Sequence, residues 1–360
     1  MVFENSFTTD NSCPLDLPYS CTNSTPIENS CCFENPGGIM LQTQFWDYYP
    51  PIGGNETFTL HGLWPDNCDG SYEQFCDRNL EIHGVEPILD KFEPGLYDEM
   101  KTYWKNFNGN DESLWEHEFN KHGTCVKTIR PQCYGNFQND RNVYDYFKVA
   151  TNLYKSLPTF EFLKEEGIVP SNEKTYTKKQ IDDALTKHFG QKVFFKCNKY
   201  QGLQEIWYFH HLKGSLLQEN FKPIDTLSHS SCPETGIKFF PKGALGPSPP
   251  PSPGRRGYLK ISNGCLISNG KFFTKGTCAT FRLVNAEFGG YNILSSKGTC
   301  GIVDDKIVCN RSKITKNQFN FKDGLVGFNS KFKWCIEGSK DQKDVVLSDG
   351  TCEEFEIRLQ

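Results

Sequence analysis

Several features that mark particular protein classes are missing from this 360-residue chain. It contains no run of about 18 apolar residues, the length that a transmembrane helix requires. Residues 1–11 lack the basic and apolar stretches of a secretory signal peptide. No two cysteines have C-x-x-C spacing, and the cysteines are spread along the chain rather than grouped as zinc ligands are. The sequence therefore predicts no membrane span and no structural zinc site.

Cysteine itself is abundant. The chain has 16 cysteines, an even number that is typical of disulfide-bonded proteins in oxidising compartments. The N-x-[ST] pattern that accepts N-linked glycans occurs at Asn23, Asn55 and Asn310. We therefore expect a glycoprotein that is secreted or resides in the vacuolar or lysosomal lumen, with its leader already removed.

A chain of this length exceeds one typical hydrophobic core, which predicts two domains. Residues 246–257 are rich in proline, and proline favours an extended, semi-rigid spacer. We expect a catalytic domain at residues 1–240, a linker at 241–257 and a small domain at 258–360. Up to residue 257 there are 24 basic and 33 acidic residues, a net charge of −9, whereas residues 258–360 have 15 and 11, a net charge of +4. The two parts therefore differ in kind.

The first part mixes two kinds of hydrophobic periodicity. Residues 143–156 and 178–189 have helical periodicity, whereas residues 193–196 and 205–209 resemble strands. This mixture predicts an α+β domain in which helices pack on an antiparallel sheet.

The last part has almost no helical periodicity but repeats a local pattern of turn residues and cysteine. The repeats end in Cys278, Cys300 and Cys352, and alternating apolar residues follow two of them. This pattern predicts a small all-β domain of hairpins joined by disulfides. The most economical pairing joins Cys265 to Cys278, Cys300 to Cys309 and Cys335 to Cys352, but sequence alone leaves the connectivity open.

The first segment with evident chemistry covers residues 58–68. Phe58 and Leu60 alternate with polar residues as a half-buried strand does, which places His61 at the end of that strand. Gly62 and the Trp-Pro-Asp run at residues 64–66 are strand breakers. We therefore expect an indole and a carboxylate on a loop beside the imidazole.

The second segment covers residues 113–125 and begins like a helix. Ser113 followed by Glu116 matches a capping box, and Gly123 would end the helix. One broad helical face then presents four polar side chains, those of His117, Glu118, Lys121 and His122.

Cleavage of RNA by transesterification needs this set of groups. A base takes the proton of the 2′-hydroxyl, an acid protonates the leaving 5′-oxygen, and cations stabilise the pentacoordinate phosphate. Histidine has a pKa of about 6.5, which suits both proton transfers, and no metal or other cofactor is required. The two segments therefore predict a metal-free ribonuclease site.

These segments resemble the two signature motifs of the ribonuclease T2 family. Residues 60–65 read LHGLWP and residues 117–125 read HEFNKHGTC. The resemblance extends from about Cys13 to about Cys232 and leaves the C-terminal part uncovered. It implies an endoribonuclease that cleaves single-stranded RNA through 2′,3′-cyclic phosphates to 3′-phosphates, with low base specificity and an acidic pH optimum.

The resemblance also implies roles for individual residues. His122 would be the general base, His61 the general acid and His117 a phosphate contact, while Glu118 and Lys121 would stabilise the pentacoordinate phosphate. A base, with adenine preferred, would bind the residues Trp64, Asp66 and Tyr72. The family's disulfide pattern would join Cys13 to Cys32, Cys21 to Cys68, Cys31 to Cys133, Cys76 to Cys125, and Cys197 to Cys232.

The sequence departs from the family pattern at two places. Phe119 stands where many members have tryptophan, which keeps an aromatic ring. Trp104-Lys105 stands where many have Trp-Pro, in a stretch that helps to form a second base pocket in the family. We therefore assign no residues to that pocket.

Simpler interpretations of single residues remain open at this level. Trp64 alone is consistent with a core residue, Asp66 with a turn cap, and Glu118 with Lys121 with an ordinary surface ion pair. A zinc protease is disfavoured because His117 and His122 are five residues apart, whereas the H-E-x-x-H motif places its histidines at i and i+4.

A second class of hypothesis is a binding protein on a nuclease fold, which the presence of all five catalytic residues disfavours. For the C-terminal domain, its positive charge suits a localisation module that binds a glycan or polyanion, and a stabilising appendage is the alternative. We expect a monomer.

Overall fold

The computed structural model describes residues 13–22, 31–107, 109–244, 255–286, 290–310, 317–329 and 331–360. The glycosylation tripeptide at Asn23 and most of the proline-rich segment lie outside these ranges. The chain divides into two units, Met1–Ser248 and Pro249–Gln360. Among the described residues, no helix is both long and apolar enough to cross a membrane.

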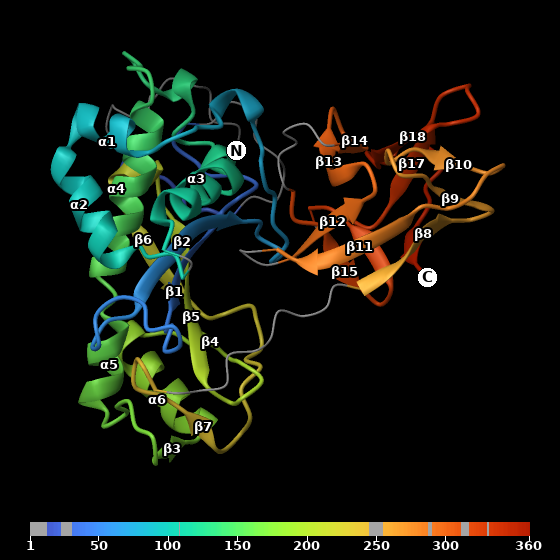
Figure 1. Ribbon diagram of the computed structural model, residues 1–360. Coiled ribbons are helices and arrows are strands. Elements are labelled where there is room, and N and C mark those ends of the chain that lie inside the picture. Colours follow the sequence, from blue (N-terminus) through green and yellow to red (C-terminus); the bar gives the residue numbers. More distant parts are fainter. Residues whose placement is uncertain are drawn as a thin grey trace. The chain divides into compact units, whose positions relative to one another are not determined.

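The first unit contains a five-stranded antiparallel sheet (Figure 1). Its strands follow the order β2-β1-β5-β4, and β6 pairs with the other half of β5. Strand β2 is therefore an edge strand, with the helical layer beside its outer side. The strands are β1 (Ile39–Phe45), β2 (Thr59–Asp66), β4 (Phe194–Cys197), β5 (Leu203–Leu212) and β6 (Phe221–Ile224), and a separate pair joins β3 (Thr175–Tyr176) to β7 (Ile237–Lys238).

Helices supply the second layer of this unit, which confirms the predicted α+β class. Helix α6 starts with a capping box between Thr177 and Gln180 and ends at Gly190, whose φ of 84° suits glycine. The helices are α1 (Glu86–Phe92), α2 (Pro94–Tyr103), α3 (Asp111–Lys121), α4 (Arg141–Lys155), α5 (Thr159–Glu165) and α6 (Lys178–Phe189), with 3₁₀ turns at Arg78–Leu80, Gly123–Cys125, Pro131–Cys133 and Leu216–Gln218.

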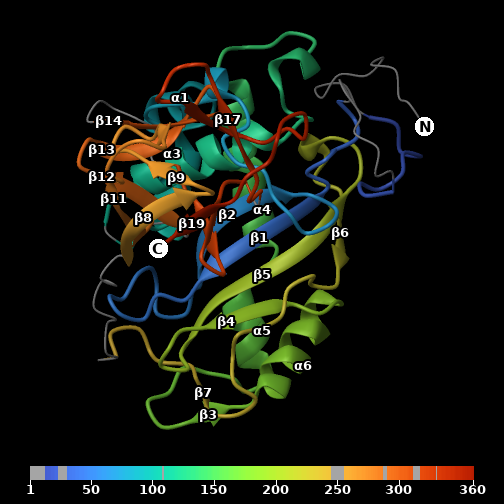
Figure 2. The same ribbon diagram turned by 90° about the vertical axis from the view of Figure 1, so that its right-hand side faces the viewer.

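The two faces of the sheet have different neighbours because side chains alternate along each strand. On one face Tyr208 of β5 hydrogen-bonds Thr159 of α5 at 2.8 Å and packs against Phe189 of α6. The helices thus cover this face, as the turned view shows (Figure 2). On the other face Leu41 and Phe209 form a small apolar cluster against which Trp64 packs, partly exposed. The candidate site lies on this second face.

Five disulfides hold the first unit together. One of them ties the segment that follows β2 to the end of α3, so that the two motifs are covalently joined. The bonds are Cys13–Cys32, Cys21–Cys68, Cys31–Cys133, Cys76–Cys125 and Cys197–Cys232, the same pairs that the family resemblance implies.

The second unit contains strands and no helix in its described part, as predicted for an all-β domain. Cys300 and Cys309 lie opposite each other in the hairpin of β13 and β14 and are bonded, and the other bonds join Cys265 to Cys278 and Cys335 to Cys352. Fully buried Phe281, Phe319 and Trp334 lie in its core.

The strands of this unit form one antiparallel sheet with short branches. Its first strand begins at Arg255, so residues 255–257 belong to it although the sequence analysis placed them in the linker. The strands are β8 (Arg255–Ile261), β9 (Gly264–Leu266), β10 (Phe272–Phe273), β11 (Thr280–Asn285), β12 (Tyr291–Ser295), β13 (Gly298–Val303), β14 (Lys306–Asn310), β15 (Asn320–Lys322), β16 (Leu325–Gly327), β17 (Trp334–Glu337), β18 (Asp344–Leu347) and β19 (Ile357–Leu359).

Candidate active site

The first motif is a strand over almost its whole length, so the loop predicted after His61 was wrong. Strand β2 continues through Gly62 and Pro65 to Asp66. Proline is tolerated here because β2 is an edge strand and needs no outward ladder bond at that position. Trp64 and Asp66 therefore point from a strand, two residues apart and on the same face.

A β-bulge lies at His61. Thr43 of β1 pairs with Gly62 and Gln44 pairs with Leu60, so His61 has no partner in β1. In a regular strand, residues 61 and 64 would point to opposite faces because side chains alternate. The extra residue shifts the phase, and His61 instead contacts Trp64 edge-on, with ring centroids 4.9 Å apart. The bulge thus brings the imidazole to the face that carries the indole.

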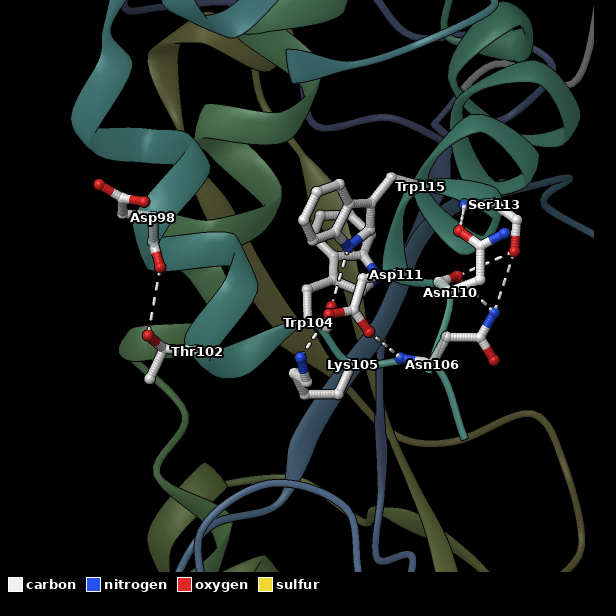
Figure 3. A network of polar contacts seen from close by, with 9 residues as sticks. All are labelled: Asp98, Thr102, Trp104, Lys105, Asn106, Asn110, Asp111, Ser113 and Trp115. Carbon is white, nitrogen blue, oxygen red and sulfur yellow. Dashed lines mark hydrogen bonds and ion pairs between the residues drawn. The ribbon is translucent and has the colours of Figure 1, made fainter. Parts of the chain in front are cut away.

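The helix of the second motif begins three residues earlier than predicted. Asn110, not Ser113, is the N-cap of α3, and its side chain accepts a hydrogen bond from the backbone of Ser113 at 3.2 Å (Figure 3). Glu116 does not complete a capping box, since its carboxylate accepts from the backbone of Gly84. Asn110 takes the cap because it lies at the turn where the chain enters the helix with non-helical backbone angles.

Glycine is required at position 123 for a different reason from the one predicted. Helix α3 ends with His122 as its C-cap, and Gly123 starts a 3₁₀ turn without a left-handed backbone. A Cβ atom at Gly123 would lie 2.5 Å from the ring of Phe119. Close packing against that ring, rather than backbone freedom, requires glycine here.

The two motifs meet at the side chain of Glu118. One carboxylate oxygen accepts the indole N–H of Trp64 at 2.7 Å, and the other lies 3.5 Å from Nε2 of His61. Glu118 and His61 are both buried. Glycine is needed at position 62 because a Cβ atom there would overlap the same carboxylate. Strand β2 and helix α3 are therefore fitted to each other at this group.

Trp64 also contacts the second catalytic candidate directly. Its indole stacks on the imidazole of His122, with ring centroids 4.9 Å apart and planes inclined by 17°. His61 and His122 thus both contact one indole ring. His61 also stacks against Phe45 of β1, with ring centroids 4.0 Å apart. No sequence signal singled out Phe45.

The electrostatics of the site follow from its burial. His122 is 3% exposed, and neither ring nitrogen has a hydrogen-bond partner among the described residues. Burial first, and then Lys121 and the neighbouring histidines, hold the pKa of His122 well below its usual value. Burial and Lys121 lower the pKa of His117 in the same way, although the His117 side chain is partly exposed.

Lys121 and Asp66 form an electrostatic pair with shifted pKa values. Burial lowers the pKa of Lys121 to about 8, which the charges of Glu118 and Asp66 oppose. Burial raises the pKa of Asp66 to about 8, against the pull of Lys121. At pH 5 the lysine is therefore charged, whereas the Asp66 carboxyl group is protonated.

Tyr72 lies next to Asp66 through the backbone. The two residues form an antiparallel bridge, and a tight turn at residues 67–71 connects them. The turn is closed by a hydrogen bond from the backbone of Asn67 to that of Ser71 at 2.8 Å. The structure therefore brings the three predicted base-binding residues to one corner of the sheet.

The other histidines that the sequence left unassigned lie elsewhere. His210 is buried on the helix-covered side between Phe189 and Phe221, and His188 stacks on Phe162 beside Glu166. In the part of the chain that the structure describes, no group of three or more His, Cys, Asp or Glu side chains is arranged to hold a metal ion.

Comparison with known proteins identifies the family of this chain. The family model described as "Ribonuclease T2 family" matches residues 37–230, more than half of the chain. The chain belongs to the ribonuclease T2 family. A second model, "RNase T2-like C-terminal domain", matches residues 252–360, the part that the sequence motifs left uncovered. The protein is thus a ribonuclease T2-type endoribonuclease whose C-terminal domain matches a separate family model.

Relatives of this ribonuclease T2 protein cover both units. A "Ribonuclease T2-like" protein from Debaryomyces hansenii is 57% identical over 365 residues, covering 96% of this chain and 90% of that protein. "Ribonuclease T2" from Aspergillus oryzae is 48% identical over 233 residues, which cover 64% of this chain. The crystal structure of Actibind, described as a T2 ribonuclease, superimposes with a TM-score of 0.60 and 41% identity over 64% of this chain.

Proposed function

We propose that this enzyme cleaves single-stranded RNA by metal-independent transesterification, with His122 as general base and His61 as general acid. The observation that carries the proposal is that both imidazoles contact Trp64 while Glu118 joins Trp64 to His61. Two proton-transfer groups therefore lie beside the same indole ring. Attack by the 2′-hydroxyl and departure of the 5′-oxygen require two such groups close together. The products are 2′,3′-cyclic phosphates and then 3′-phosphates.

His122 suits the role of base because it stays neutral. Burial and nearby positive charge hold the pKa of His122 well below its usual value, which favours the neutral ring with a free lone pair. Neither ring nitrogen is engaged by another described residue. His122 can therefore accept the proton of the 2′-hydroxyl without first losing a hydrogen bond.

His61 suits the role of acid because a carboxylate lies beside its ring. One carboxylate oxygen of Glu118 lies 3.5 Å from Nε2 of His61. Because the carboxylate also accepts from Trp64, its position is fixed. We therefore assign Glu118 to holding His61 as well as to balancing Lys121 at the pentacoordinate phosphate.

Lys121 and His117 supply the phosphate-binding side of the site. A pKa of about 8 keeps Lys121 charged below neutral pH, where it stabilises charge that grows on the phosphate in the transition state. Its charge is lost as the pH rises through 8. Together with the excess of acidic residues before residue 257, this favours an acidic pH optimum.

Base recognition is proposed for Trp64, Asp66 and Tyr72, with adenine preferred and overall specificity low. A protonated Asp66 offers one O–H donor and one carbonyl acceptor. Adenine presents the matching pair, a ring nitrogen and an amino group. Trp64 and Tyr72 provide aromatic surface beside that carboxyl group.

The test is product analysis with the sixteen dinucleoside phosphates across pH 4 to 8, with and without EDTA. We expect cyclic phosphates to accumulate first, fastest cleavage where adenine occupies one site, and no effect of EDTA. Loss of activity in EDTA that zinc restores, or products that carry 5′-phosphates, would overturn the mechanism. An optimum above pH 8, where Lys121 loses its charge, would overturn the assignment of Lys121, and a neutral optimum would overturn the proposed acidic one.

The setting and the second unit complete the proposal. All 16 cysteines are in disulfides, which supports a secreted or vacuolar protein, because cytosolic reductants keep thiols reduced. We propose that the second unit, with its net charge of +4, binds a polyanion or cell-wall glycan, and that the protein is a monomer. Gradient sedimentation and glycan binding by the intact protein test these two points.

A further inference from the structure

The outer edge of β2 is bonded by aromatic side chains. An edge strand leaves one row of backbone groups without a strand partner. Two carbonyl groups along β2, and that of Phe58 just before it, accept from buried donors of the helical layer. Tyr154 donates to the carbonyl of Phe58 at 2.6 Å, Trp104 to that of His61 at 2.7 Å, and Tyr146 to that of Leu63 at 2.8 Å.

The bond at His61 differs from the other two because it falls on the β-bulge. His61 has no pairing partner in β1, so the regular register of the sheet is interrupted at its peptide group. Its side chain is 4% exposed, and a buried carbonyl without a partner is costly. The indole N–H of Trp104, itself fully buried, supplies that partner.

The segment that contains Trp104 is also anchored to the start of α3. The carbonyl of Trp104 accepts the indole N–H of Trp115 at 2.9 Å. Asp111 accepts from the backbone of Asn106 at 2.8 Å and forms an ion pair with Lys105 (Figure 3). One short segment, residues 104–106, therefore contacts the strand of the general acid and the helix of the general base.

We propose that Trp104 is a positioning residue that fixes the orientation of His61 relative to His122. The proposal rests on the proposed function, because it concerns the relative placement of the two proton-transfer groups. Trp104 is fully buried, so it acts through the carbonyl group of His61 and through α3. Lys105, which departs from the family pattern, serves the same anchor by pairing with Asp111.

The test compares Trp104→Phe with two matched variants in steady-state cleavage of a dinucleoside phosphate. Phenylalanine keeps most of the ring volume and removes the indole donor. We expect kcat to fall about tenfold or more, with KM within about twofold, because small displacements of reacting groups slow the chemical step. The acidic limb of the kcat profile, which reports the essential groups in the bound complex, should also shift.

Tyr154→Phe is the control on the same segment, since it removes an equivalent bond to Phe58, just before β2 and three residues before His61. Trp334→Phe is the control for losing a buried indole donor, because Trp334 donates to the carbonyl of Val326 in the second unit. Both should destabilise the protein while leaving kcat within about twofold. Equal losses of kcat in Trp104→Phe and Tyr154→Phe would overturn the proposal.

A second variant keeps the test decisive if Trp104→Phe does not fold. Asp111→Ala removes the anchor of residues 104–106 at the helix start and should lower kcat in the same direction by a smaller factor, with KM unchanged. An unchanged kcat in Asp111→Ala would then count against the positioning role. Full activity of His61→Ala and His122→Ala would instead remove the proposed function itself, a different outcome.

Discussion

In the first unit, ionisable side chains are buried beside one another, whereas in the described part of the second unit no charged side chain is buried. The buried group of the first unit comprises His61, Glu118, Lys121 and His122. The second unit keeps its charges at the surface, where Lys271 and Lys306 both pair with Asp344. Burying charge is unfavourable unless it is paired. The first unit therefore contains the buried ionisable groups that the proposed chemistry uses and that make the folded state less stable.

The largest expected effect is the loss of RNA cleavage when a histidine of the first unit is replaced. His122→Ala should lower RNA cleavage by a factor on the order of 10²–10⁴, because it removes a positioned proton acceptor. The folding of the second unit should not change. Initial rates on a dinucleoside phosphate measure the loss, and a second-unit variant such as Lys271→Ala should show none. A biological effect that survives His122→Ala would support a binding role beside catalysis.

A smaller loss is expected for Glu118→Gln. The amide oxygen can still accept from Trp64, but the negative charge beside His61 is gone. We expect kcat to fall about tenfold to a hundredfold, within the range of one electrostatic contact in a buried site. Glu337→Gln, on an exposed strand position of the second unit, is the matched control. Equal activity of the two variants would contradict the coupling of Glu118 to His61.

A change in pH dependence should follow from Asp66→Asn. The pKa of Asp66 is raised from 3.8 to about 8 in the folded state, so ionising this group opposes folding. This penalty is absent below pH 3.8, grows between about pH 4 and 8, and is complete above 8. Replacing the carboxyl group should make the first unit less sensitive to pH in that window, by on the order of 1 kcal/mol, since Asp66 is partly exposed. Urea unfolding at pH 5 and pH 8 measures it, and an unchanged difference would refute it.

The smallest effect is expected from the second unit itself. Removing residues 255–360 should leave cleavage of dinucleoside phosphates unchanged, because the catalytic groups all lie in the first unit. On polymeric RNA we expect the cleavage rate to fall about two- to fivefold, because the positive charge of this unit attracts the RNA. The ratio of the two rates is the measurement. Equal ratios with and without the unit would assign it to another ligand or to stability.

Much of the fold was predictable where local sequence rules agree with one another. Helix α6 was predicted with its observed limits from hydrophobic periodicity, and in the structure Thr177, Gln180 and Gly190 cap the same limits. The all-β character of the second unit followed from its turn residues and cysteines. The helix of the second motif was located, but its start was misplaced by three residues because Asn110, not Ser113, is the cap.

The site was predictable as a set of residues but not as an arrangement. The residues after His61 suggested a loop because glycine and proline break most strands, but an edge strand with a bulge accommodates both. Nothing local indicated Phe45, which stacks on His61, or Trp104, which bonds the carbonyl of His61. Both lie more than ten residues away in sequence.

The sequence by itself determined which groups the proposed chemistry can use: two histidines, a lysine and a glutamate in two motifs. The tertiary structure alone decided that Glu118 lies between Trp64 and His61, and that His122 stacks on the same indole. The reason is that residue types set which protons can move. Their distances are set by the packing of α3 against an edge strand, which no local pattern records.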